Sequence, residues 1–195
     1  ALSRGLGDVY KRQLSAEIME RLKPHLQLSE TVGLLVSQLA GGHVKEMELR
    51  LQGEFASHPS QPLVIAALKG LLSAALGDSI NFVNASLEAK ARGIQVLEVK
   101  DESSRDFAGG SLQITTRGDQ GDRCVTGAVF ADGELRITSI DEFPVNVSPS
   151  RHMLFTRHRD MPGIIGHLGS MMGEHNVNIA SMQVGRKIVR GDAVM

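Results

Sequence analysis

The chain has 195 residues, of which 42% are hydrophobic and 22% charged, a balance that is ordinary for a folded globular protein. Its 21 Lys and Arg residues against 22 Asp and Glu leave a net charge of −1, which argues against a nucleic-acid-binding protein, and its short, interrupted apolar runs argue against a membrane-spanning one. A single cysteine, Cys124, excludes an internal disulfide and a multi-cysteine metal site and favours a reducing, cytoplasmic setting.

The N-terminal part of the chain predicts an arm followed by helix. Residues 1–13 have no apolar period, no starting Met and no signal-peptide core, so we expect a disordered arm or a segment foreign to the fold. Residues 15–40 carry a helical apolar stripe that Ser15 can cap and that Pro24 should break. The glycine at position 41 should end this helical region.

A strand and two further helices are predicted next. Residues 43–52 alternate between apolar and charged side chains, which is typical of a half-buried strand. Pro62 suits the first residue of a helix over 63–76, whose almost continuous apolar sequence predicts a central position. A second amphipathic helix is predicted over 79–92, ending at Gly93.

The period then changes to that of strands. Four strand-like segments separated by polar turns are predicted at 94–100, 111–117, 122–131 and 134–140. Helices followed by strands indicate an α+β domain over residues 14–141, with helices packed on one face of an antiparallel sheet. Residues 142–151 contain two prolines and no helical period, and we interpret them as a linker or connecting strand.

Residues 152–195 predict a second, smaller module. Its expected elements are a strand at 152–158, a helix at 162–175 that Asn176 ends, a strand at 177–186 and the start of a strand at 191–195. This order is the front half of a ferredoxin-like fold, a βαββ module that is incomplete at the C-terminus. Gly166 and Gly169 should give the helix a close-packing face.

The sequence offers little sign of catalysis. It contains no glycine fingerprint for a dinucleotide, no phosphate-binding loop and no nucleophile elbow. We therefore expect no catalytic residue and no bound cofactor in this chain. Its seven histidines do not fall in a zinc-protease spacing, so we expect no metal site either.

The segment around Asp160 is the most informative. A strand delivers the chain to Asp160, and Pro162 then starts a helix whose first amide groups point outward. Free amides favour a carboxylate, and Asp160 can accept an ammonium group. One helix start therefore offers partners for both charged groups of an α-amino acid. Asn178 on the following strand adds an amide side chain. The alternative is that Asp160 only caps its helix.

Two strings carry a resemblance to a known family. They are His158-x-Asp160-x-Pro162-Gly163-Ile164-Ile165-Gly166 and Gly173-Glu174-His175-x-Val177-Asn178-Ile179-Ala180, and they look like the start of an ACT domain. Upstream, Gln38-Leu39-Ala40, Leu68-Lys69-Gly70-Leu71 and Ile80-Asn81-Phe82-Val83-Asn84-Ala85 are similar to an intervening, allosteric substrate-binding domain. In this order they resemble the C-terminal regulatory region of the long-form D-3-phosphoglycerate dehydrogenase family, over about residues 14–195.

The resemblance implies a regulatory function. The family oxidises 3-phosphoglycerate with NAD, but the residues for that chemistry lie upstream of this region, so the chain itself should be catalytically silent. Paired ACT domains of the family bind L-serine for feedback inhibition, which implies homo-oligomers formed through the ACT and intervening domains. Carried over, the effector-binding residues are His158, Asp160, Pro162, Gly163, Ile164, Ile165 and, from a partner subunit, Asn178. An anion site in the intervening domain has four candidates, Lys69, Lys90, Arg92 and Arg151.

Two other functions stay open at this point. The chain could be an oligomerisation module without a ligand, or a chain of an iron–sulfur L-serine dehydratase, which uses related domains. The single cysteine argues against the second, because such clusters usually need three or four thiolates.

Overall fold

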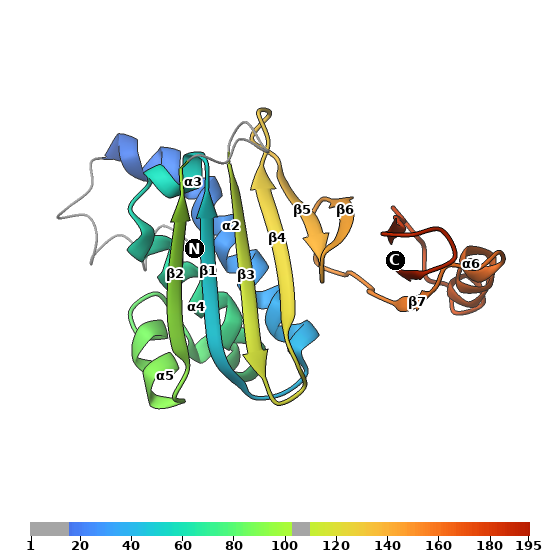
Figure 1. The fold of residues 1–195 in the computed structure, drawn as a ribbon, viewed down its shortest axis with the longest axis horizontal. Helices are drawn as coiled ribbons and strands as arrows, with labels where there is room; N and C mark the ends of the chain where they lie inside the picture. Colours follow the sequence, from blue (N-terminus) through green and yellow to red (C-terminus); the bar gives the residue numbers. More distant parts are fainter. Residues whose placement is uncertain (1–15, 103–109) are drawn as a thin grey trace.

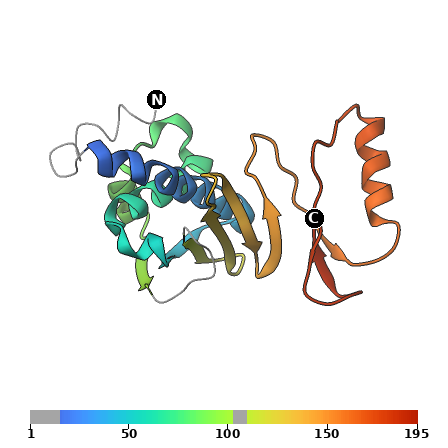
Figure 2. The same ribbon diagram turned by 90° about the horizontal axis from the view of Figure 1, so that it is seen from above.

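The structure, a computed structural model, describes residues 16–102 and 110–195. A helix-and-sheet unit occupies most of this range, and a smaller C-terminal module follows it (Figures 1 and 2). The arm expected at residues 1–13 and the expected cap Ser15 lie outside the described residues.

A six-stranded sheet forms one layer of the first unit. Its spatial order is β2-β1-β3-β4-β5-β6. The strands are β1 (Val44–Gln52), β2 (Gln95–Asp101), β3 (Ser111–Gly118), β4 (Arg123–Val129), β5 (Leu135–Ile140) and β6 (Phe143–Val147). All neighbours pair antiparallel except β1 and β2, which are parallel. The parallel pair requires a long crossover, which a run of helices supplies.

The helices cover one face of this sheet and leave the other open (Figure 1). They are α2 (Ala16–Ala40), α3 (Glu54–Ser57), α4 (Ser60–Leu76), the short 3₁₀ turn η1 (Gly77–Ser79) and α5 (Ala85–Ala91). The two long helices approach each other through glycines. A β-carbon added at Gly70 would stand 2.0 Å from the Glu30 carbonyl oxygen, and one at Gly33 would stand 2.2 Å from that of Ala67.

The alternation of β1 decides which face of the sheet is buried. Met47, Leu49 and Leu51 are fully buried beneath the helices, whereas Glu48 and Arg50 between them lie on the open face. A strand sends successive side chains to opposite faces, so the pattern read from sequence predicts this arrangement correctly. The α+β class with helices on one face of the sheet is thereby confirmed.

Two predicted helix boundaries are wrong. Pro24 lies inside α2, which continues through it. A proline in a helix interior costs about 3 kcal/mol, and the burial of Leu22 and Leu26 on either side offsets that cost. The predicted helix at 79–92 forms only as α5, because the Asn81 side chain accepts hydrogen bonds from the backbone N–H of Val83 and Asn84 instead.

Smaller differences concern the helix starts and the predicted linker. α4 begins at Ser60, so Pro62 is the third residue of the helix rather than the first. Part of the segment 142–151 forms β6, which pairs with β5 at the edge of the sheet.

The C-terminal module contains β7 (Arg157–Arg159), α6 (Ile164–Glu174), β8 (Gly185–Arg186) and β9 (Asp192–Val194), with the three strands in the order β7-β9-β8. Its first two predicted strands are much shorter than expected. The predicted close-packing face of α6 is also wrong within the described part of the chain, because a β-carbon at Gly166 or Gly169 would meet nothing within 4 Å. Asn176, with a φ of 56°, ends the helical region as predicted.

One described segment, Ser60–Ser79, is long and apolar enough to cross a membrane by length and composition alone. The expectation from sequence that the chain does not span a membrane stays a prediction. In the structure this segment comprises α4 and η1, and α4 packs against α2 in the core, where helices of the same composition are commonly found.

Candidate functional site

The candidate site lies where β7 leads into α6. Gly163, with a φ of 95°, is the residue at the N-cap of α6, and no side chain caps the helix. The interpretation of Asp160 as the helix cap is therefore wrong, since this residue stands three positions earlier. The first amides of α6 have no intrahelical acceptor, so a helix start without a side-chain cap can bind an anion.

Asp160 is fixed by two donors from the end of the module. Its Oδ2 accepts a hydrogen bond from Arg186 Nη1 at 2.9 Å and another from the Arg190 backbone N–H at 3.2 Å. The Asp160 side chain is 20% exposed. The Arg186 guanidinium, and after it the Arg190 amide, hold the pKa of the Asp160 carboxyl below its ordinary value. Asp160 is therefore a carboxylate at neutral pH.

A small cavity of about 250 Å³ opens beside Asp160. Its walls are His158, Asp160, Met161, Ile164, Ile165, Val184 and Arg186. Four predicted site residues thus come together here: His158, Asp160, Ile164 and Ile165. The cavity combines one carboxylate, one guanidinium and an imidazole with apolar walls, which suits a small zwitterionic molecule.

Three other predicted site residues do not line this cavity. Pro162 and Gly163 form the turn that leads into α6, and Asn178 is exposed in the segment after α6. Sequence reasoning gave no role to Arg186, Met161 and Val184. Arg186 follows Asp160 by 26 residues, and no local period or spacing signals that these two side chains meet.

The four candidate residues for an anion site do not line the cavity beside Asp160. The Lys69 ammonium pairs with Glu30 and lies 4.7 Å from the centre of the Phe82 ring. Arg92 pairs with Glu88 one turn away on α5, and Lys90 and Arg151 are exposed. Two of the four charges therefore already have acidic partners.

A larger cavity, about 620 Å³, lies between β4–β6 and the C-terminal module. Three basic side chains line it, and each pairs with an acid: Arg123 with Asp141 and Arg157 with Asp192 at 2.9 Å, and Lys187 with Glu142 at 2.6 Å. Burial raises the pKa of the Cys124 thiol in its wall, so this cysteine is not an activated nucleophile. A fourth acid in the lining, Asp122, lies 3.8 Å from Arg117, so each charged side chain that the structure describes in this wall has a partner of opposite charge.

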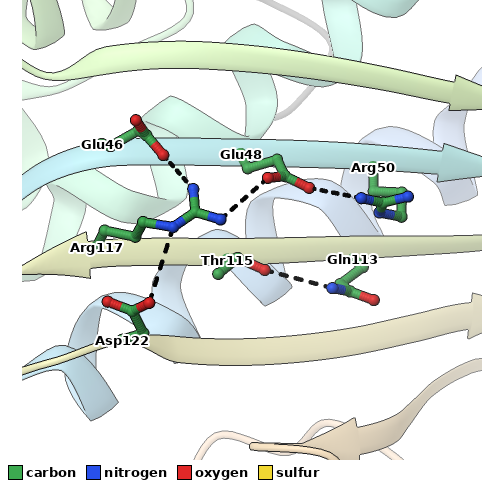
Figure 3. Close-up of polar contacts among 7 residues, drawn as sticks. All are labelled: Glu46, Glu48, Arg50, Gln113, Thr115, Arg117 and Asp122. Atoms are coloured by element: carbon green, nitrogen blue, oxygen red, sulfur yellow. Dashed lines mark hydrogen bonds and ion pairs between the residues drawn. The ribbon is translucent and has the colours of Figure 1, made fainter.

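The open face of the sheet carries a connected charge network (Figure 3). Arg117 on β3 pairs with Glu46 and, at 3.2 Å, with Glu48 on β1, and Glu48 also accepts a bond from Arg50 at 3.0 Å. Burial raises the pKa of the Glu48 carboxyl, but bonds to Arg117 and Arg50 outweigh it, and the pKa is lowered overall. These charges satisfy one another across the strands and form a structural network.

Comparison with known proteins identifies both parts of the chain. Residues 21–141 match the D-3-phosphoglycerate dehydrogenase intervening domain, and residues 152–195 match the ACT domain. The chain belongs to the D-3-phosphoglycerate dehydrogenase intervening-domain family. Its sequence order, an intervening domain followed by an ACT domain, agrees with the predicted regulatory region.

Three curated relatives of this chain are all named D-3-phosphoglycerate dehydrogenase. The chain is 58% identical over 183 residues to D-3-phosphoglycerate dehydrogenase of Synechocystis sp., and 37% identical over 179 residues to that of Methanocaldococcus jannaschii. It is also 33% identical over 175 residues to the enzyme of Bacillus subtilis. These alignments cover 93%, 92% and 90% of this chain but only 33%, 34% and 33% of the relatives. The chain therefore spans about a third of the length of the relatives it matches.

Proposed function

We propose that this chain is the regulatory part of a D-3-phosphoglycerate dehydrogenase and that its ACT module binds L-serine as a feedback inhibitor. The whole protein would oxidise 3-phosphoglycerate to 3-phosphohydroxypyruvate with NAD, in serine biosynthesis. The chain matches about a third of the relatives' length, and the proposal assigns the catalytic residues and the NAD site to the remaining two thirds. This chain contributes the effector site.

The observation that carries the proposal is the cavity at the start of α6. Both hydrogen bonds to Asp160 use Oδ2, so Oδ1 can accept a bond from the serine ammonium group. The serine carboxylate would bind the uncapped amides at Ile164 and Ile165, where the helix dipole favours negative charge. His158 lines the same cavity and can bond the serine hydroxyl.

The C-terminal module also supports a homo-oligomer. Ile165 and Met171 on α6 are 54% and 41% exposed, and Ile188 and Val189 near β9 are 72% and 68% exposed. Exposed apolar side chains concentrated in one small module are typical of an interaction surface. A second copy docked there would bring its Asn178 toward the site, and serine held between two copies would favour one arrangement of the subunits.

Calorimetric titration of L-serine into the chain tests the proposal. We expect saturable binding that Asp160→Ala abolishes. Asp78→Ala, on an exposed turn of the other unit, should leave it unchanged. 3-Hydroxypropionate, which keeps the hydroxyl and carboxylate but lacks the ammonium group, should bind far more weakly. Absence of saturable heat at millimolar L-serine, or equal binding by Asp160→Ala, would refute serine recognition at this site.

A further inference from the structure

A cluster of two histidines and a glutamate lies in the other unit of the chain, where α2 passes α3. The potential donor atoms of His25, Glu54 and His58 all lie within 4.8 Å of one another. Glu54 Oε1 stands 4.0 Å from His58 Nε2. The cluster belongs to the intervening domain and is not part of the ACT cavity.

The fold holds this cluster in a defined geometry. His25 comes from α2 and is only 5% exposed. Glu54 and His58 are four residues apart around α3, so their side chains project from the same side of one helical turn. Phe55 between them is fully buried and meets the His25 ring edge-on at 4.4 Å. Packing in the core thus fixes α3 against α2.

The two imidazoles are already close to each other. Their ring centres lie 4.6 Å apart, with the ring planes at 71°. Exposure rises from His25 to His58, whose side chain is 19% exposed, and to Glu54 at 53%. The cluster is therefore buried at the His25 end and exposed to solvent at the Glu54 end.

The donor set suits a divalent metal of the zinc type. Zn²⁺ takes imidazole nitrogen and carboxylate oxygen at about 2.0–2.2 Å, and two histidines with one carboxylate leave a position for water. At those bond lengths, tetrahedral geometry places neighbouring ligand atoms about 3.3 Å apart. Separations of up to 4.8 Å thus need a contraction of up to about 1.5 Å, to which rotation of the exposed Glu54 side chain can contribute.

Two charged side chains of the described residues lie at the cluster, those of Glu54 and Lys100. The Lys100 ammonium, from β2, donates to the backbone carbonyl of His58 at 3.3 Å and not to its ring. Glu54 contributes one negative charge at the open end. Two neutral imidazoles and a carboxylate would reduce the charge of a bound Zn²⁺ by one unit.

We propose that His25, Glu54 and His58 form a Zn²⁺ site that ties α2 to α3 in the intervening domain. The proposal goes beyond serine recognition and does not depend on it. His25 comes from α2 in the core, and Glu54 and His58 come from the short helical turn that follows β1. A bound ion would therefore link two segments that are separated by almost thirty residues of chain.

Titration of Zn²⁺ into the metal-stripped, tag-free chain tests this site. We expect one saturable site per chain by calorimetry, and a visible tetrahedral spectrum when Co²⁺ is added instead. Glu54→Gln keeps the shape of an exposed side chain and should weaken Zn²⁺ binding at least about tenfold, since loss of outer-shell partners alone costs about 10–100-fold in affinity. His58→Asn should weaken it further.

His152→Ala, which removes an exposed histidine from the other end of the chain, is the matched control and should bind as the unmodified protein does. Circular dichroism of each variant without metal shows whether it is folded, and Glu54→Gln keeps the test valid if His58→Asn does not fold. No saturable site in the unmodified chain, or equal affinity in Glu54→Gln, would mean that the three side chains only pack against one another.

Discussion

The helices α4 and α6 differ in what covers them. α4 buries nine of its 17 residues, whereas α6 buries none of its 11, although both are rich in apolar side chains. The difference follows from their surroundings: α4 packs against α2 and lies over a six-stranded sheet, whereas the strands beside α6 contain two or three residues each. An apolar sequence predicts a helix whose side chains need to be buried. Whether they are buried depends on the helices and strands that pack beside it.

The largest expected effect is loss of a core side chain from the first unit. Leu49→Ala removes a fully buried side chain from the middle of β1 and should lower the free energy of unfolding by about 2–5 kcal/mol. Ile165→Ala on α6 is the counterpart in the second unit. Because Ile165 is 54% exposed, its replacement should change stability by less than about 0.5 kcal/mol. Urea unfolding of the two variants measures both effects, and similar losses would contradict the contrast in burial.

Replacing a glycine by alanine should change stability in opposite directions in α4 and α6. Gly70→Ala on α4 should destabilise the protein by about 1–3 kcal/mol, because the new methyl group would overlap the α2 backbone at Glu30. Gly169→Ala on α6 meets open space within the described residues and should raise helix stability by about 0.5–1 kcal/mol. Thermal melts of the two variants distinguish these outcomes. A stabilising Gly70→Ala would show that the two helices are not in close contact.

Much of the secondary structure of the first unit is predictable because it follows from patterns of neighbouring residues in the sequence. The alternation of Met47, Leu49 and Leu51 gives the buried face of β1, and the glycine after Ala40 places the end of α2. Where tertiary contacts compete with local preference, prediction fails. Pro24 remains inside a helix whose flanking leucines are buried, and Asn81 redirects backbone amides that would otherwise continue a helix.

The candidate effector site was predictable only in part. His158, Asp160, Ile164 and Ile165 are close in sequence, so the turn before α6 brings them together without help from distant residues. Arg186 reaches Asp160 from a later strand, and that contact depends on the pairing of β7 with β9 and of β9 with β8. The His25–Glu54–His58 cluster was missed for the same reason, since its residues come from α2 and from the turn at α3, which are separated by β1.

The smallest expected effects concern one carboxylate in each unit. Glu48 in the sheet and Asp160 in the C-terminal module both have a pKa below the ordinary value in the folded protein. A carboxyl with a lowered folded-state pKa stabilises the fold above its unfolded pKa and loses that contribution as pH falls through the folded-state pKa. We therefore expect the stability gap between the protein and Glu48→Gln to be present at neutral pH and to close below about pH 4.

Replacing Glu48 and replacing Asp160 should change stability by different amounts. The Glu48 side chain is 14% exposed and bonds two arginines, so the gap at neutral pH should be about 1 kcal/mol, near the upper end for such pairs. Asp160 bonds the half-exposed Arg186, and Asp160→Asn should change stability less and lose its effect as salt is added. Unfolding curves at several pH and salt values measure both. A gap for Glu48→Gln that widens as the pH falls would show that the arginines on the open face do not favour its carboxylate form.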